Sequence, residues 1–180
     1  NKILELNVEE KYVWVQPGVV LDHLNAYLKP HGLWFPVDVS TSSRATIGGM
    51  SANNSCGSRS LYYGNMVHNV LAIEAILDDG SIFNFDQINK NYLATKNNQD
   101  RLYKIIDKFI DVRQQVGGEI DANWPTTQRR VGGYNIDLID PEGFNSSNLL
   151  VGSEGTLSLF INKDNVCLLY TSDAADDLRG

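Results

Sequence analysis

Hydroxyl, amide and glycine residues are concentrated between positions 36 and 64 of this 180-residue sequence. Only Arg44 and Arg59 carry a charge after Asp38 in that stretch. The Gly48–Gly49 pair lacks the Cβ atoms that would keep a ligand away from the backbone, and glycine also accepts positive φ. The nearby side chains that can exchange hydrogen bonds are Ser40, Thr41, Ser42, Ser43, Thr46, Asn53 and Asn54. This inventory suits a ligand that has phosphates and a polar heterocycle.

A solvated surface loop is the alternative interpretation of the same stretch, because Ser and Gly are typical of such loops. Ile47, Met50 and Ala52 add apolar side chains that a simple linker does not need. We therefore predict a short helix over residues 46–54. The first amides of a helix lack partners within it, and its dipole favours negative charge. We therefore expect this helix to point free N–H groups at a ligand.

Other common catalytic patterns do not occur in the sequence. It has no H-E-x-x-H, C-x-x-C, P-loop, G-x-G-x-x-G or G-x-S-x-G motif. The three histidines are not spaced with other residues as metal ligands would be, so we predict no metal site. His68 could be a base, but a lone histidine at the entrance of a strand is more often structural. Redox chemistry would therefore require a cofactor.

Composition limits the class of protein. A formal net charge of −7 and a pI near 4.8 disfavour nucleic acid or an anionic membrane as a partner. No run of about 18 apolar residues predicts a transmembrane helix, and the start of the chain has no basic leader. Two cysteines, Cys56 and Cys167, are too few for a disulfide framework. We expect a cytoplasmic protein, or one peripheral to the membrane in its full-length form.

Hydrophobic patterning predicts the elements before residue 46. Alternation over 3–8 and 12–15 predicts a β-hairpin. Apolar residues at helical spacing over 19–29 predict a helix that Pro30 ends, and 33–35 predict a short strand.

The second half of the sequence alternates between periodic and irregular segments. Alternation over 70–77 and 82–85, around an Asp-Gly turn, predicts another hairpin. We expect no element over 86–100, an amphipathic helix from Arg101 to about Gly117–Gly118, and an irregular connector over 119–127. Residues 149–160 predict a strand, a turn around 152–155 and a second strand.

Three blocks of this sequence resemble motifs of one flavoprotein family. Residues 36–64 resemble the central motif of the FAD-linked oxidases, which are of the vanillyl-alcohol oxidase type and include glycolate, D-lactate and D-2-hydroxyglutarate dehydrogenases. The sequence LVGSEGTL at 150–157 is similar to the late signature of the family, and RRVGGYNI at 129–136 to the segment that precedes that signature. The blocks occur in the family's order, within residues 1–162.

The resemblance implies an α+β fold, the FAD-binding PCMH-type domain. Residues 1–162 would be part of this domain, mainly its second lobe, an antiparallel sheet flanked by helices. The first lobe is expected to be truncated, because the family's R-G-G-G-T loop is not found. Residues 163–180 have no periodic face and resemble nothing in the family. We interpret them as a non-family tail, an artefact of cloning or sequence assembly or a frameshift, and expect no element there.

The resemblance also implies a function. The protein would bind FAD and oxidise a 2-hydroxy acid of the D-lactate, glycolate or D-2-hydroxyglutarate type by hydride transfer to flavin N5. The third block is most similar to members with a fused iron–sulfur domain, which would be one electron acceptor. In the family the groups that act on the substrate lie mainly in a cap domain. We therefore assign no catalytic residue and expect the chain alone to be inactive.

Other interpretations of the three blocks stay open. The same flavin fold occurs in sugar-nucleotide reductases and in alkyl-glycerone-phosphate synthases, and a non-catalytic domain could retain the scaffold without flavin.

Contacts with FAD carry over onto the central and late blocks. Residues 40–49 would line the pyrophosphate and ribityl region, 53–57 would lie near the isoalloxazine, and 154–157 would close around the adenine side. Cys56 would fill space as a small residue. The complete expected set is Pro36, Asp38, Ser40, Thr41, Ser42, Ser43, Arg44, Ala45, Thr46, Ile47, Gly48, Gly49, Asn53, Asn54, Ser55, Cys56, Gly57, Glu154, Gly155, Thr156 and Leu157.

Overall fold

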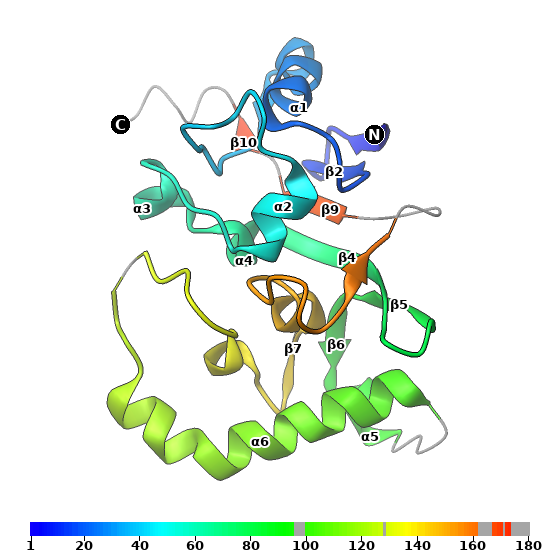
Figure 1. Ribbon diagram of the computed structural model, residues 1–180, viewed down its shortest axis with the longest axis vertical. Coiled ribbons are helices and arrows are strands. Elements are labelled where there is room, and N and C mark those ends of the chain that lie inside the picture. Colours follow the sequence, from blue (N-terminus) through cyan, green and yellow to red (C-terminus); the bar gives the residue numbers. More distant parts are fainter. Residues whose placement is uncertain (96–99, 128, 162–166, 171, 174–180) are drawn as a thin grey trace.

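The computed structural model describes residues 1–95, 100–127, 129–161, 167–170 and 172–173 (Figure 1). Helices pack around a main antiparallel sheet whose strands follow the order β1-β2-β9-β4-β5, with β8 also paired to β4. The strands of this sheet are β1 (Ile3–Asn7), β2 (Tyr12–Val15), β4 (Val70–Ile76), β5 (Ile82–Phe85), β8 (Leu159–Phe160) and β9 (Cys167–Tyr170). A mixture of helices with an antiparallel sheet agrees with the predicted α+β class.

Both predicted hairpins are confirmed. β1 and β2 pair with Leu6 opposite Val13, so that alternate side chains of β2 enter the core. β4 and β5 are joined by a tight turn in which Gly80 has φ +82 and the Asp79 carboxylate accepts the Ser81 amide at 2.9 Å. A position with positive φ favours glycine, which explains why the Asp-Gly pair in the sequence predicts this turn.

The expectation that the last residues form no element is wrong for 167–170 and 172–173. β9 lies between β2 and β4 and pairs with both of them, while β10 (Ser172–Asp173) pairs with β3 (Leu33–Trp34). The sequence CLLY is a short continuous apolar run, and such a run is typical of a strand inside a sheet, where alternation is not required. Strands pair through main-chain hydrogen bonds, so a segment without family motifs can still join the sheet. The origin of the segment 163–180 stays a prediction.

The helix predicted over 19–29 and the one predicted over 46–54 are both present. α1 (Leu21–Leu28) buries its three leucines and continues into a 3₁₀ turn, η1 (Lys29–His31), after which Gly32 at φ +72 ends the helical segment. α2 (Ile47–Ala52) lies near the centre of the molecule (Figure 1). Two further short helices follow it, α3 (Ser60–Tyr63) and α4 (Met66–Asn69).

The long helix α6 (Arg101–Asn123) extends five residues beyond Gly118, so the predicted end at Gly117–Gly118 and the connector over 119–123 are wrong. Each glycine costs a helix only about 1 kcal/mol relative to alanine. Ile120, which is buried, holds the last turns against the protein. Pro125 ends the helix instead, because the residue before a proline avoids helical dihedrals, and Trp124 has ψ 134°.

A second core lies under α6. It contains Ile88, Ile106, Ile110, Ile139, Phe144 and Leu149. The prediction of no element over 86–100 is wrong here, because β6 (Gln87–Asn89) and α5 (Lys90–Ala94) form within it, and β6 pairs with β7 (Gly143–Asn145). The partner strand is 54 residues away in sequence, so local alternation could not reveal the pair. The remaining elements are η2 (Ile136–Leu138) and η3 (Ser146–Leu149), and Leu149 therefore ends a 3₁₀ turn rather than opening the predicted strand.

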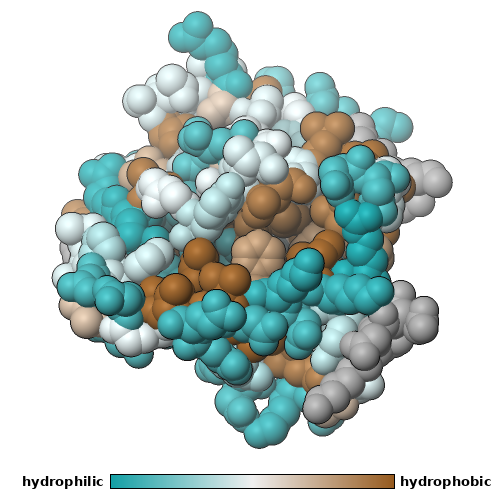
Figure 2. Space-filling view, turned by 60° about the horizontal axis from the view of Figure 1, so that its bottom comes forward, coloured by the Kyte–Doolittle hydropathy of each residue, from teal (hydrophilic) through white to brown (hydrophobic). Residues whose placement is uncertain are grey.

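α6 runs along the bottom of the view in Figure 1, and Figure 2 turns this side of the molecule toward the viewer. Apolar side chains gather in the middle of this face, among hydrophilic ones (Figure 2). A hollow of about 210 Å³ lies between the two cores and is lined by residues that include Leu77, Phe85, Ile105 and Phe109. Arg101 pairs with Asp78 and Asp79 at its edge, which joins the start of α6 to the β4–β5 turn.

The continuous helix across Gly118 predicts the effect of a substitution. Gly118→Ala should raise the free energy of unfolding by about 0.5–1 kcal/mol, because an added Cβ meets nothing within 4 Å and alanine favours the helix. Thermal or urea unfolding measures the change. Gly80→Ala, at positive φ in the β4–β5 turn, is the control and should be destabilised. A destabilised Gly118→Ala variant would contradict a helix that continues past this position.

Candidate functional site

The central and late blocks, about 100 residues apart in sequence, are joined at the C-terminal end of α2. The Gly152 amide donates to the Ser51 carbonyl at 2.9 Å, and the Glu154 amide donates to the Ala52 carbonyl at 2.9 Å. Carbonyls in the last turn of a helix have no partner within the helix, so the late block satisfies them. Glu154 itself has φ +50, which shows how tightly the chain turns here.

The third block is bound to the same place. The Asn135 side chain, buried to 2 % exposure, donates to the Val151 carbonyl at 2.8 Å. The Tyr134 hydroxyl lies 2.9 Å from the Thr156 hydroxyl. A Cβ on Gly152 would come within 3.2 Å of the Gly133 carbonyl oxygen, so the two loops touch through their backbones. The three sequence blocks therefore form one continuous structure.

The N-terminal end of α2 differs from the prediction. The Ile47 amide donates to the Val19 carbonyl at 2.9 Å, and the Gly48 amide donates to the Pro17 carbonyl at 2.7 Å. The Gly49 amide donates to the Thr46 hydroxyl, which caps the helix. The expectation that these amides are free for a ligand is therefore wrong. Residues 17–19 cross the start of α2 and occupy them, a contact that the local sequence does not reveal.

The two glycines of α2 have different surroundings. Gly48 is buried, and a Cβ there would lie 2.4 Å from Cβ of Pro17. Its small size is therefore required by packing. Gly49 is exposed, and a Cβ there would meet only the Thr46 hydroxyl, at 3.0 Å. Gly49 is the glycine that leaves room for a ligand.

Gly49 opens onto a hollow of about 370 Å³ between the central and late blocks. Its lining is Pro17, Gly18, Thr46, Gly48, Gly49, Ala52, Gly155, Ser158, Leu159 and Phe160. These residues expose mainly carbon, and the nearest helix amides already have partners. We refer to this feature as the glycine hollow. Its chemistry suits a flat ring better than a pyrophosphate.

Asp38, which precedes α2, and Gly57, which follows it, hold together the two segments that flank this helix. The Asp38 carboxylate accepts hydrogen bonds from the Ser58 hydroxyl at 2.6 Å and the Arg59 amide at 3.0 Å. A Cβ on Gly57 would lie 1.5 Å from the Asp38 carbonyl oxygen, so only glycine fits. Burial by itself would raise the pKa of Asp38, but these hydrogen bonds and the charge of Arg59 hold it below its ordinary value. Both residues therefore have a structural role.

The remaining residues expected to contact FAD differ in how far they are exposed to solvent. Those open to solvent are Ser40, Thr41, Ser43, Arg44, Gly49, Asn53, Glu154, Gly155 and Thr156. Those partly covered are Ser42, Ala45, Thr46, Ser55, Cys56 and Leu157. Pro36, Ile47 and Asn54 are buried. In the hydroxyl-rich turn over 40–44, all side chains except the partly covered Ser42 are therefore exposed, where a ligand could reach them.

Asn54 shapes the chain after α2. It has φ +50 and is 1 % exposed, and its Oδ1 accepts the Val67 amide at 3.0 Å. Its Nδ2 finds no partner within the described residues. Cys56, two residues later, accepts a hydrogen bond from Arg129 at 3.5 Å. This contact brings the third block beside residues 53–57.

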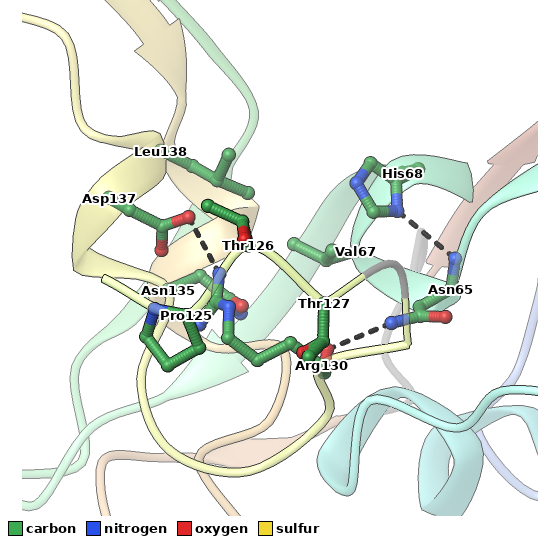
Figure 3. Close-up of a pocket in the computed structure, with 10 residues that line it drawn as sticks. All are labelled: Asn65, Val67, His68, Pro125, Thr126, Thr127, Arg130, Asn135, Asp137 and Leu138. Atoms are coloured by element: carbon green, nitrogen blue, oxygen red, sulfur yellow. Dashed lines mark hydrogen bonds and ion pairs between the residues drawn. The ribbon is translucent and has the colours of Figure 1, made fainter. Parts of the chain in front are cut away.

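A second, polar pocket of about 240 Å³ lies between α4 and the loop that follows α6 (Figure 3). We call it the His68 pocket; its lining is Asn65, Val67, His68, Pro125, Thr126, Thr127, Arg130, Asn135, Asp137 and Leu138. His68 does serve the structure, as expected, because its Nδ1 accepts the Asn65 amide at 3.0 Å and thereby caps α4. Arg130, from the third sequence block, forms a partly buried ion pair with Asp137 at 2.6 Å.

Burial lowers the pKa of His68 from its ordinary 6.5, and the neighbouring Arg130 charge acts in the same direction. The Asp137 carboxylate opposes this shift. His68 is therefore neutral at neutral pH. The described residues contain no group of three metal-binding side chains. In the part of the chain that the structure covers, no helix has the length and apolar character needed to span a membrane.

Comparison with known proteins gives relatives that match most of this chain. Residues 1–86 match the family model described as FAD binding domain. A D-2-hydroxyglutarate dehydrogenase of Haemophilus influenzae is 37 % identical over 166 residues, which are 87 % of this chain and 16 % of that protein. The enzyme of the same name from Escherichia coli is 38 % identical over 165 residues, 88 % of this chain and 16 % of that protein. A probable mitochondrial D-lactate dehydrogenase of Danio rerio is 31 % identical over 159 residues, 88 % of this chain and 22 % of that protein. The chain thus spans about one sixth of the first two relatives.

The neutral state of His68 predicts how stability depends on pH. The free energy that this residue contributes to folding is present above the unfolded pKa of 6.5 and is lost as pH falls through the lower folded pKa. Protonation also removes the lone pair that accepts the Asn65 amide. Unfolding measured between about pH 5 and 8 should show this loss.

His68→Asn is the matched variant for this prediction, because its Oδ1 can replace Nδ1 as the acceptor but does not titrate. As pH is lowered, the free energy of unfolding of this variant should fall less than that of the wild type. An identical pH profile for both proteins would rule out the assigned role of His68.

Proposed function

This chain belongs to the FAD-linked oxidase family, and we propose that it forms part of the FAD site of an enzyme that oxidises a 2-hydroxy acid of the D-2-hydroxyglutarate or D-lactate type. When bound, FAD supplies the acceptor for the hydride that leaves C2 of the hydroxy acid, while the hydroxyl proton passes to a base or to water. The names of the relatives support this class of substrate.

The observation that carries the proposal is the meeting of the central and late blocks at the glycine hollow. Gly49 and Gly155 open onto it from the two blocks, and the hydrogen bonds from Gly152 and Glu154 to the end of α2 hold the blocks together. A cavity lined mainly by carbon, with the hydroxyl-bearing residues Thr46 and Ser158 in its lining, fits a cofactor that joins flat rings to phosphates.

The residues fit FAD, but the parts of the cofactor that they would contact differ in part from those expected from the sequence. We propose that the glycine hollow takes a ring, in agreement with the expected role of 154–157 at the adenine side. The exposed hydroxyl turn over 40–44 then borders the phosphates, in place of the α2 amides, which have protein partners. The other expected contacts, 53–57 included, stay proposals.

Further features of the whole protein are proposals as well. We propose that this chain is mainly the second lobe of the flavin domain and that another lobe contributes the remaining phosphate contacts. A fused iron–sulfur domain is one proposed electron acceptor. The substrate-binding groups of the proposed enzyme would lie in a cap domain.

Gly49→Val in the whole protein tests the cofactor assignment. A valine side chain would enter the glycine hollow. Overpacking of this kind costs about 1–3 kcal/mol, so the dissociation constant for FAD should rise by about tenfold to hundredfold. Flavin content after purification and FAD titration of the apoprotein measure the effect, and unfolding measured without FAD should change little.

Two variants control this experiment. Gly118→Val makes the same change on α6 and should keep full flavin content. Gly48→Ala should lower stability instead, since its Cβ meets Pro17. The proposal fails if the whole protein neither carries nor takes up FAD. The assignment of the hollow fails if Gly49→Val binds FAD like the wild type.

A further inference from the structure

The His68 pocket presents hydrogen-bonding groups of known direction. Nδ1 of His68 accepts the Asn65 amide at 3.0 Å, so the proton of the neutral ring is on Nε2. His68 lines the pocket, and Nε2–H is the group that it offers to a ligand (Figure 3). The pocket thus has a fixed neutral donor on its α4 side.

Arg130 is held on the opposite side by several contacts. Its Nη2 pairs with Asp137 at 2.6 Å, its carbonyl accepts the Asn65 side chain at 2.9 Å, and its guanidinium lies 5.0 Å from the centre of the Trp124 ring. A guanidinium carries five N–H groups, so it can bind Asp137 and a ligand together. Its position is fixed before any ligand arrives, which lowers the entropic cost of binding.

Asp137 supplies an acceptor. Its Oδ2 binds Arg130, while its Oδ1 is buried and finds no partner within the described residues. A buried polar atom without a partner is costly, so a ligand donor at this point would be favourable. His68, Arg130 and Asp137 therefore supply two donors and one acceptor.

The formal charge of the pocket selects the ligand class. The positive charge of Arg130 is balanced by Asp137, and His68 is neutral. A dicarboxylate would bring unbalanced negative charge next to Asp137. A neutral cyclic imide, which has an N–H between two carbonyls, matches the two donors and the acceptor without added charge.

We propose that the His68 pocket receives the pyrimidine edge of the flavin ring, with the donors of His68 and Arg130 at its N1–C2=O side and Asp137 Oδ1 at N3–H. This inference rests on the proposed function. Charged and hydrogen-bonding groups near N1 tune the electronics of a flavin. His68 and Arg130 are therefore positioning residues that make the ring a better acceptor of negative charge.

Hydrogen bonds link the walls of the His68 pocket to the segments that form the rest of the proposed FAD site. Asn135 lines it and is bonded to the late block, and the neighbouring Tyr134 reaches Thr156. On its other side Val67 is bonded to Asn54, within the residues expected near the isoalloxazine. The segments that line the glycine hollow and the His68 pocket are therefore held in fixed positions relative to one another, as a cofactor with rings at both ends requires.

Substitution of His68 and Arg130 in the FAD-loaded whole protein tests the proposal. The probe is sulfite, which adds reversibly to flavin N5, bleaches the visible band and leaves negative charge on the N1–C2=O side. Arg130→Gln should raise the dissociation constant for sulfite by about tenfold to hundredfold, the range for loss of one charge-assisted hydrogen bond. The visible spectrum of its bound flavin should shift as well.

Two substitutions at His68 separate its roles. His68→Asn keeps the acceptor that caps α4 and removes the Nε2 donor, so it should weaken sulfite binding at nearly unchanged stability. His68→Gln keeps a donor near Nε2 and loses the cap, so it should lose stability but retain sulfite affinity. Arg113→Gln is a matched control on α6, where Arg113 pairs with Asp121, and should behave like the wild type.

The outcomes distinguish this inference from the proposed function. If bound FAD has the same spectrum and sulfite affinity in Arg130→Gln and His68→Asn as in the wild type, the His68 pocket does not hold the pyrimidine edge, although FAD is bound. If these variants change only KM for the hydroxy acid, the pocket binds substrate and the inference is overturned. A whole protein that binds no FAD overturns the proposed function itself.

Discussion

The main-chain hydrogen bonds at the two ends of α2 organise this protein. At the start of the helix, the carbonyls of Pro17 and Val19 accept the first amides, and at its end the carbonyls of Ser51 and Ala52 accept amides of the late block. A six-residue helix is too short to be stable alone. It forms because two other segments of the chain, 17–19 and 152–154, satisfy its ends. The same bonds bring Gly49 and Gly155 to one hollow, so the proposed cofactor site exists only when they form.

Buried and partly buried asparagines extend this arrangement beyond α2. Asn135 and Asn145 donate to the Val151 and Val70 carbonyls, and Asn54 accepts the Val67 amide. In loops that are buried, the backbone cannot obtain partners from a helix or a sheet, and a side-chain amide replaces them. The site thus consists mostly of irregular backbone whose position is fixed by polar side chains. Fixed positions are what recognition of a large cofactor requires.

The same residue type serves different purposes at the site. Gly48 and Gly57 are small because Pro17 and Asp38 lie against them, whereas Gly49 faces open space. The Nδ1 of His68 likewise belongs to the fold and its Nε2 to the pocket. A substitution can therefore remove ligand binding or stability separately, depending on which atoms it changes.

The sequence by itself determined the hairpins, α1, α2 and the family, since these depend on local alternation, turn residues and short motifs. It also placed the candidate cofactor residues in the central and late blocks. The tertiary structure alone decided which partners the α2 amides have, because Pro17 and Val19 are about 30 residues away from them. It also decided the β6–β7 pair, the extension of α6 past Gly118 and the place of β9 inside the sheet. The His68 pocket is of the same kind: its ion pair, cap and buried acceptor arise from two segments that meet only in the folded chain. Contacts over such distances depend on packing and on satisfying buried polar groups, and no local pattern encodes them.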